Sequence, residues 1–491
     1  MSDGKIIQEN GENIIPITHE TCVLDDEGNP ITETIGDVSL LSTESRNLVG
    51  AINEVFGDII KEQLVVKLND NNIDATTNET WSELIEKIDT KFDEIKTHEE
   101  ENKAKWFNIL KLSGFDVNEN DSMDNMYNEV YEKSNATKDV KQIDCGGLFT
   151  IVQKKDNTLW CTGYNGNGQL GLGHNNNISV FTQITDMGTD VKQIACGNQY
   201  VLLLKNDGTV WAAGNNQNYQ CGISGTTSFN IFKQVSVDNV KQIACGTVHS
   251  MIVKNDGSLW GCGYTQYDRT GLGHGTGSIS SFTKVNNSNI NNDVKEVFCS
   301  DFGSYILKND GTVWVCGYNQ TGCLGLGNNN NVNSITKVNI DNVKQIACGL
   351  EYTMIVKNDG TLWATGGNGY GQLGLGDTAN KYTFTQVTDN VSSVSCGYEH
   401  TFILKNDGSV WSCGRNNGGQ LGIGVSDNNP HSTFTQVNID NVKQVICSDR
   451  YTIIIKNNDS LWGCGYNGYG ELGMNDITAR NIFVNRTGFG I

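Results

Sequence analysis

A unit of about 50 residues, repeated seven times, constrains this chain more than any other feature. The seven tryptophans of the repeat follow one another at intervals of 51, 49, 54, 49, 48 and 51 residues: Trp160, Trp211, Trp260, Trp314, Trp363, Trp411 and Trp462. Each stands in a phrase such as Asp207-Gly208-Thr209-Val210-Trp211, after a Val-Lys-Gln-Ile-x-Cys-Gly-like phrase, and most precede Gly-Gln-Leu-Gly-x-Gly. A period of this length is typical of a solenoid or a propeller.

Short β-type runs decide between these two architectures. One unit contains four such runs, at Val343–Cys348, Tyr352–Val356, Thr361–Ala364 and Thr385–Val387. The equivalent of Lys405–Gly408 forms a hairpin turn between the second and third runs, and no stretch inside the unit has a helical period. Four short antiparallel strands per unit predict a propeller blade, and ring closure removes exposed sheet ends.

These phrases together resemble the RCC1 repeat. The resemblance rests on Cys-Gly-x-x-x-Thr, Lys-x-Asp-Gly-x-Leu-Trp-x-x-Gly and Gly-Gln-Leu-Gly-x-Gly, and covers residues 140–491. It implies a mainly β fold with a seven-bladed RCC1-like β-propeller. Asn218–Gly225 and Tyr267–Gly275 lack the Gly-Gln-Leu-Gly core, so we expect differently shaped loops there.

Charge divides the chain near Asp139. Residues 1–139 carry a net charge of −19, whereas residues 140–491 carry −2 and 49 of the 56 glycines. The total of −21 argues against binding to nucleic acid or to an anionic membrane, because both favour basic surfaces. No apolar run approaches the roughly 18 residues of a membrane span, and residues 1–15 lack the pattern of a secretory signal.

Most of the fifteen cysteines recur in register with the repeat, seven of them before a Gly or Ser and five just after a tryptophan. Such cysteines are best interpreted as small buried side chains, and no paired spacing indicates a zinc site. His249 and His400 belong to a mostly aromatic series four residues after the cysteine, so we predict a structural role. No catalytic motif is present, and we expect neither enzymatic activity nor a cofactor or metal.

The fourth residue after each tryptophan is the candidate binding position. Several of these residues carry aromatic or guanidinium groups beside variable polar loops, a common arrangement for recognition. Packing on a neighbouring blade would explain them equally well. The candidate receptor-binding residues are Tyr164, Tyr264, Tyr318, Arg415 and Tyr466.

The N-terminal part divides into an extended attachment arm at 1–37 and an adaptor helix at 38–66. The pattern Pro-Ile-Thr-His, followed by Leu48–Val55, resembles adaptor segments of phage tail-fibre and baseplate proteins. This resemblance implies attachment to a particle through Pro16, Thr18, His19, Val23 and Asp25.

Residues 67–139 contain two similar short segments, each a turn leading into an eight-residue amphipathic helix, joined by a charged helix. We therefore predict small duplicated helical modules. The charged helix has one apolar row at a spacing of seven and one polar row, whereas a coiled coil needs two apolar rows. Formation of a homo-oligomer is left open.

The sequence interpretation is a non-enzymatic structural component of a phage tail or tail-like particle, a virion component without a signal peptide. Its N-terminus would dock on other tail or baseplate proteins, and the propeller would bind a bacterial surface protein or glycan. The alternative is an RCC1-type regulator or effector, acting in guanine-nucleotide exchange or as a protein-binding scaffold. The near-neutral propeller and the lack of a basic tail weigh against a guanine-nucleotide exchange factor or a chromatin factor.

Overall fold

A computed structural model describes residues 7–9, 12–14, 140–225, 227–273 and 277–485. Contacts divide the chain into two units, Met1–Asn135 and Ala136–Ile491. In the first unit, strands β1 (Ile7–Glu9) and β2 (Glu12–Ile14) pair antiparallel. The second unit contains seven four-stranded antiparallel sheets, which we number as blades 1 to 7 in chain order.

The strands of each blade are called first to fourth from the centre of the ring outward. The first strands are β3 (Val140–Cys145), β7 (Val191–Cys196), β11 (Val240–Cys245), β15 (Val294–Cys299), β19 (Val343–Cys348), β23 (Val391–Cys396) and β27 (Val442–Cys447). The second strands are β4 (Phe149–Lys154), β8 (Tyr200–Lys205), β12 (His249–Lys254), β16 (Gly303–Lys308), β20 (Tyr352–Lys357), β24 (His400–Lys405) and β28 (Tyr451–Lys456).

The outer half of each blade completes the sheet. The third strands are β5 (Leu159–Gly163), β9 (Val210–Asn215), β13 (Leu259–Tyr264), β17 (Val313–Gly317), β21 (Leu362–Gly366), β25 (Val410–Asn416) and β29 (Leu461–Gly465). The fourth strands are β6 (Ile178–Ile184), β10 (Ser228–Gln234), β14 (Ser278–Lys284), β18 (Val332–Lys337), β22 (Lys381–Thr388), β26 (Asp427–Gln436) and β30 (Arg480–Asn485).

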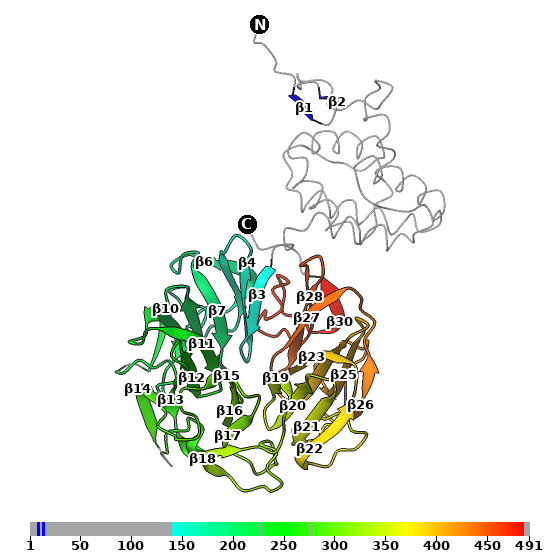
Figure 1. Cartoon of the computed structure of the whole chain (residues 1–491). Helices are drawn as coiled ribbons and strands as arrows, with labels where there is room; N and C mark the ends of the chain where they lie inside the picture. The colour runs from blue at the N-terminus through cyan, green and yellow to red at the C-terminus, as the bar shows by residue number, and fades with distance from the viewer. Residues whose placement is uncertain (1–6, 10–11, 15–139, 226, 274–276, 486–491) are drawn as a thin grey trace. The chain divides into compact units, whose positions relative to one another are not determined.

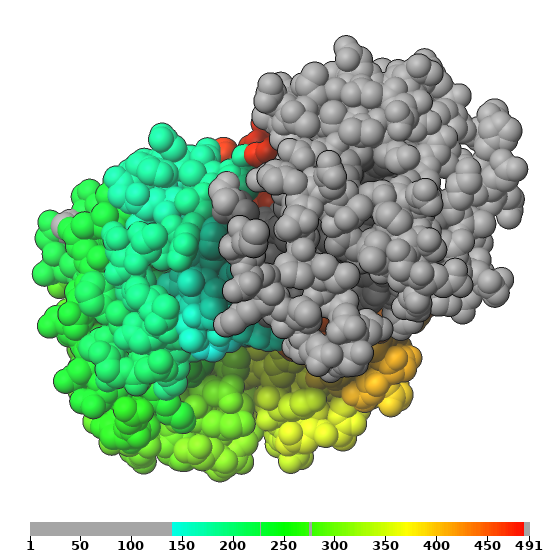
Figure 2. Space-filling view, turned by 90° about the horizontal axis from the view of Figure 1, so that it is seen from above, coloured from blue at the N-terminus to red at the C-terminus, as the bar shows by residue number. Residues whose placement is uncertain are grey.

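The blades form a closed ring. First strands of successive blades contact one another and line its centre, and β27 of blade 7 contacts β3 of blade 1 (Figure 1). In the space-filling view the colours run from cyan and green through yellow to orange along the visible side of the propeller, in chain order (Figure 2). Blades 1 and 7 each take all four strands from one continuous segment, so the ring closes without a shared sheet. The predicted mainly β, seven-bladed propeller is confirmed.

Burial explains the composition of the strands. The second strand is buried along almost its whole length in every blade, as in Tyr200–Lys205, because it lies between two sheets. The fourth strand is largely half-buried or exposed, as in Lys381–Thr388. A continuous apolar run therefore marks the middle of a blade, and a polar run marks its outer edge.

The repeated Lys-Asn-Asp-Gly-Thr-Leu-Trp phrase builds the hairpin between the second and third strands. In blade 5 the Asp359 carboxylate accepts hydrogen bonds from the amide and hydroxyl of Thr361, at 2.9 and 2.7 Å. The Trp363 indole donates to the same hydroxyl at 2.9 Å, and Lys357 Nζ lies 4.8 Å from the indole centroid. A lysine stacks on the tryptophan in this way in all seven blades. The phrase therefore encodes a local structure, and packing explains the tryptophans.

The ring four residues after the repeated cysteine links each blade to the next. Tyr200 Oη donates to the His249 carbonyl at 2.6 Å and lies 2.8 Å from Ser250 Oγ. His249 Nε2 in turn lies 3.0 Å from Ser304 Oγ of blade 4. The same pairing of a ring with a hydroxyl joins Tyr352 to Thr401, His400 to Thr452 and Tyr451 to Thr150.

Two blades depart from this pairing and compensate for it. Blade 1 has Phe149, which cannot donate a hydrogen bond, and blade 2 offers Val201 in the same buried cluster. Blade 4 has Gly303 at the ring position. There Tyr305, two residues later, accepts the hydrogen bond from Thr353 of blade 5 at 2.6 Å. The link is therefore kept around the whole ring in a polar or an apolar form.

The glycine that follows the cysteine leaves room for this ring. A Cβ atom at Gly349 would overlap the Tyr352 ring, and one at Gly397 would overlap His400. None of the fourteen described cysteines forms a disulfide in the described part of the chain. Those just after the tryptophans, such as Cys161 and Cys464, are fully buried, and burial raises the pKa of the Cys161 thiol. They act as small apolar side chains.

The predicted small helical modules are not supported. The only helix in the described part of the chain is a three-residue 3-10 helix, η3 (Gln266–Asp268). Residues 38–66 and 67–139 lie outside the described residues, so their division into an adaptor helix and duplicated modules stays a prediction. Eight-residue amphipathic segments have little cooperativity of their own.

We predict that Tyr451→Phe lowers the free energy of unfolding of the full chain by about 1–2 kcal/mol, because it removes the buried hydrogen bonds of the phenol with the Phe149 carbonyl and the Thr150 hydroxyl. Adding Thr150→Val copies the native Phe149–Val201 pair. The double variant should therefore lose less than the sum of the two single losses. Urea titrations of the four proteins measure this coupling. Strictly additive losses would contradict the proposed pairing.

Candidate functional site

The candidate positions occupy one face of the propeller. On this face, which we call the rim face, lie the turns joining the first strand to the second and the third to the fourth. In every blade the fourth residue after the tryptophan donates its amide to the carbonyl three residues after the cysteine. The seven pairs are Tyr164–Leu148, Asn215–Gln199, Tyr264–Val248, Tyr318–Phe302, Gly367–Glu351, Arg415–Glu399 and Tyr466–Arg450. The structure thus places all five predicted residues at equivalent, half-buried positions.

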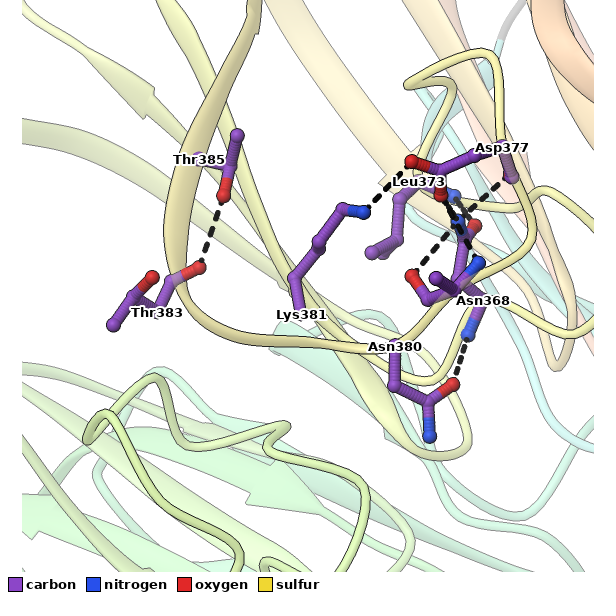
Figure 3. A network of polar contacts seen from close by, with 8 residues as sticks. Asn368, Leu373, Asp377, Asn380, Lys381, Thr383 and Thr385 are labelled. Atoms are coloured by element: carbon purple, nitrogen blue, oxygen red, sulfur yellow. Dashed lines mark hydrogen bonds and ion pairs between the residues drawn. The ribbon is translucent and has the colours of Figure 1, made fainter.

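A buried asparagine holds the rim loop that follows. In blade 5 the Asn368 side chain accepts the Leu373 amide at 3.0 Å and donates to the Asp377 carbonyl at 2.8 Å (Figure 3). Asn380 accepts the Asn368 amide, and Lys381 forms an ion pair of 2.8 Å with Asp377 (Figure 3). Equivalent buried asparagines are Asn165, Asn216, Asn319, Asn416 and Asn467. The rim loops are therefore anchored at their base.

Blade 2 keeps this loop structure although it lacks the Gly-Gln-Leu-Gly core. The Asn216 side chain accepts the Cys221 amide at 3.0 Å, as its counterparts do with leucine. Blade 3 is different, because Thr265 replaces the asparagine and η3 forms there. Tyr267 and Asp268 both have positive φ, of 60° and 54°. The expected change of loop shape is thus found in blade 3.

Blades 3 and 4 form an aromatic group around one arginine. Arg269 is almost fully buried, and its guanidinium carbon lies 5.3 Å from the Tyr264 ring centroid and 5.5 Å from that of Phe302. Its guanidinium donates to the Gln266 and Asp301 carbonyls. Tyr318 packs on Phe302 and on Tyr267, each at 5.5 Å. A cation held between aromatic faces stabilises this part of the rim.

Blades 7 and 1 form a second aromatic group, which consists of three tyrosines. Tyr469 packs against Tyr164 of blade 1 at 5.1 Å and against Tyr466 at 6.3 Å between ring centroids. Tyr164 and Tyr466 each fold over a glycine two residues later, where a Cβ atom would overlap the phenol. The rings are therefore held in place while they remain half-exposed.

Blade 6 contributes a charged pair to the rim face. Arg415 forms an ion pair of 2.6 Å with Glu399, and its guanidinium lies 4.8 Å from the Tyr370 ring centroid. Glu351 of blade 5 lies close to Tyr318, and partial burial raises the pKa of this glutamate. The rim face therefore combines tyrosines with acidic and guanidinium groups.

Turns from four blades meet at the centre of the rim face. Asn198 of blade 2 donates to Tyr398 Oη of blade 6 at 2.9 Å and to Asp449 of blade 7 at 3.2 Å. Burial, together with the charge of Asp301 of blade 4, raises the pKa of Asp449 well above its usual value. Burial also raises the pKa of Asp301 to about 7. These polar groups cross-link turns far apart in the sequence.

The two repeat-position histidines are structural in their geometry. Both are fully buried, and burial lowers the pKa of His400 to about 3 and that of His249 well below its usual value. Each contacts a hydroxyl of the next blade. A neutral imidazole sealed inside the ring has no access to a substrate. Across the described ranges, no three His, Cys, Asp or Glu side chains are grouped as metal ligands.

Several rim residues were missed from the sequence. Arg269, Phe302, Tyr469 and Glu471 belong to the two aromatic groups, but the predicted binding position was only the fourth residue after the tryptophan. The ninth residue after the tryptophan would have indicated Arg269 and Glu471, because four other blades have a glutamine there: Gln169, Gln220, Gln372 and Gln420. Pro16, Thr18, His19, Val23 and Asp25 lie outside the described residues.

The geometry defines a closed repeat propeller with variable side chains on a rigid rim. Sequence profiles agree with it: that of the RCC1-like domain matches residues 112–389, and those of the Regulator of chromosome condensation (RCC1) repeat match 391–420 and 407–455. The chain therefore belongs to the RCC1-like domain family.

Curated relatives match over short stretches. A secretion-regulating guanine nucleotide exchange factor of Bos taurus is 34% identical over 85 residues, which are 17% of this chain and 18% of that protein. The human X-linked retinitis pigmentosa GTPase regulator is 35% identical over 95 residues, which are 19% of this chain and 9% of that protein. The matches thus span less than a fifth of these relatives.

Solved structures share the fold. Human WBSCR16 has a TM-score of 0.58 at 23% identity, with 65% of this chain and 87% of that chain covered. Prp20p of Saccharomyces cerevisiae has a TM-score of 0.60 at 18% identity, with 71% and 87% covered. At these identities the likeness concerns the fold alone.

The interpretation as a phage tail or tail-like particle component is wrong, and with it the tail-fibre, baseplate and virion assignments. The relatives are eukaryotic proteins named as a guanine nucleotide exchange factor and a GTPase regulator, which favour the RCC1-type alternative. Two further expectations are wrong for the same reason. They are that the partners are tail proteins and a bacterial surface protein or glycan, and that the protein is located on a particle. A short extended phrase and one predicted amphipathic helix carry too little information to assign a function.

We predict that Asp301→Asn stabilises the chain more at pH 8 than at pH 4. As the pH rises from about 4 to about 7, the unfolded chain loses this proton while the folded chain keeps it, so the wild type loses stability. Asparagine has no proton to lose. The difference between variant and wild type in the free energy of unfolding should grow by about 1–3 kcal/mol over this range. Equal differences in urea titrations at both pH values would contradict the buried acid.

Proposed function

We propose that this protein is an RCC1-type regulator that acts as a protein-binding scaffold and recognises its partner through the rim face. The observation that carries the proposal is the ring of equivalent positions on one face, occupied by Tyr164, Tyr264, Tyr318, Arg415 and Tyr466. Tyrosine and arginine are the residues most enriched at energetically important contacts between proteins. The function requires binding and no covalent chemistry.

Rigidity supports this proposal. Each rim tyrosine is fixed at its backbone by the hydrogen bond to the neighbouring turn, and the buried asparagine fixes most of the loops beyond it. Tyrosine loses little conformational entropy on binding, because it has only two side-chain torsions. A partner would therefore meet a surface that is already arranged.

Packing was the alternative explanation for these residues, and both explanations apply. Tyr264 and Tyr318 contact Arg269 and Phe302 within the propeller, so part of their surface is structural. All five residues nevertheless keep an exposed part on the same face. A packed base with an accessible edge is the usual anatomy of an interaction hot spot.

Site-specific crosslinking tests the proposal. A photoreactive phenylalanine at Asn215 on the rim face should capture a protein partner in cells that express the chain. The same group at Asn255, in a hairpin turn on the opposite face, serves as the matched control. The combined Arg415→Ala and Tyr318→Ala variant should weaken binding of the captured protein at least tenfold. Equal capture at both positions, or unchanged binding, would contradict recognition by the rim face.

A second candidate is guanine-nucleotide exchange on a small GTPase. The match to the bovine exchange factor favours it. Release of a fluorescent GDP analogue from purified small GTPases provides the test. Acceleration of at least tenfold by the full chain on one GTPase would support exchange. No acceleration across the panel would leave the scaffold function alone.

A further inference from the structure

The two aromatic groups of the rim face are built from equivalent positions. Tyr466 and Tyr469 of blade 7 correspond to Tyr264 and Tyr267 of blade 3, since they are the fourth and seventh residues after the tryptophan. The next blade supplies Tyr164 in one group and its counterpart Tyr318 in the other. The propeller therefore contains the same tyrosine arrangement twice.

The two aromatic groups differ at the ninth residue after the tryptophan. In blade 3 it is Arg269, whose guanidinium lies between Tyr264 and Phe302. In blade 7 it is Glu471, and Leu148 of blade 1 stands in place of Phe302. One group thus holds a cation from this chain, whereas the other has a smaller neighbour and a carboxyl group at the equivalent position.

The Glu471 carboxyl is incompletely satisfied. Its side chain is fully buried, and Oε2 accepts the Tyr469 amide at 2.9 Å, which fixes the carboxyl beneath the tyrosine loop. Oε1 is buried and has no hydrogen-bond partner among the described residues. Burial raises the pKa of this carboxyl and the backbone amides of Glu471, Tyr469 and Gly470 lower it, so its charge is only partly compensated and a nearby cation would stabilise it.

We propose that the site formed by Tyr164, Tyr466, Tyr469 and Glu471 binds an arginine side chain of a partner protein. The exposed edges of the tyrosine rings would stack on the guanidinium, and the negative charge of the carboxyl buried beneath them would favour a cation at this place. Blade 3 shows the arrangement with an arginine in place. This proposal rests on the rim face being a protein-binding surface, and it names the chemistry of one contact.

The charged and titratable groups around Glu471 are few. Its own loop provides Tyr466 and Tyr469, blade 1 provides Tyr164, and the turn before β28 provides Arg450. Burial and the charge of Glu471 raise the pKa of Tyr466, and the charge of Arg450 offsets part of this rise. Burial raises the pKa of Glu471 to about 7. Because a cation binds the ionised carboxyl, affinity should rise as the pH increases from 6 to 8.

The test uses the full chain and the acetylated, amidated peptide Gly-Gly-Arg-Gly-Gly. Saturation-transfer difference NMR should detect binding, with the strongest signals from the arginine δ protons. The peptide with citrulline, which has the same shape without the charge, should not bind. The lysine peptide should bind more weakly, because ammonium is not planar.

Glu471→Gln is the decisive variant. Glutamine occupies this position in four other blades, so the variant keeps the fold that the repeat already tolerates. This variant should weaken binding of the arginine peptide at least tenfold and abolish the pH dependence of the affinity. Glu296→Gln, which removes an acid from a first strand, is the matched control and should change neither. Tyr469→Ala should weaken binding at least threefold.

The Arg450→Ala variant tests whether Arg450 of this chain, and not an arginine of the partner, occupies the site. If the peptide binds only to this variant, Arg450 occupies the site and the proposal is wrong. Absence of binding to the wild type, or equal binding to Glu471→Gln, would overturn it as well. If crosslinking from the rim face succeeds while the peptide fails, the scaffold function stands and this contact alone is refuted.

Discussion

The contact between a buried ring in one blade and a buried hydroxyl in the next holds this propeller together. The sheets share no strand, so the ring depends on side chains that cross each boundary, together with backbone bridges such as Val180–Met474 between blades 1 and 7. Tyr451 closes it by donating to the Phe149 carbonyl at 2.6 Å. A ring next to a hydroxyl satisfies two polar groups at once, and removing either partner leaves the other desolvated. This requirement explains why ring and hydroxyl change together, as in the Phe149–Val201 pair.

The rim face varies because this framework carries the stability. Backbone hydrogen bonds, and in six of the blades a buried asparagine, place the fourth, seventh and ninth residues after the tryptophan. Arg269 in blade 3 and Glu471 in blade 7 show how far the ninth position can differ without a change of fold. Substitutions that would damage a core are therefore available for recognition, and the face can be specific to a partner.

Much of the fold could be predicted from the sequence. The first strand Val343–Cys348 was predicted with its observed bounds, because its buried pattern repeats seven times. The fourth strand was predicted too short, at Thr385–Val387 instead of Lys381–Thr388, because an outer strand lacks a clear apolar pattern. The fourth residue after the tryptophan was identified from its place in the repeat. Arg269 and Glu471 were not identified, because their contacts depend on the neighbouring blade. The contact of Asn198 with Tyr398, 200 residues away, leaves no local signal at all.

Hydrogen–deuterium exchange on the full chain tests most directly whether the blades form one cooperative ring. If side-chain links close the ring, the amides of the buried second strands should become exposed in a single opening event. The seven second strands, β4, β8, β12, β16, β20, β24 and β28, should then share the same free energy of exchange. Separate exchange of individual blades, with blades 1 and 7 opening first, would contradict a ring that is held closed by its side-chain links.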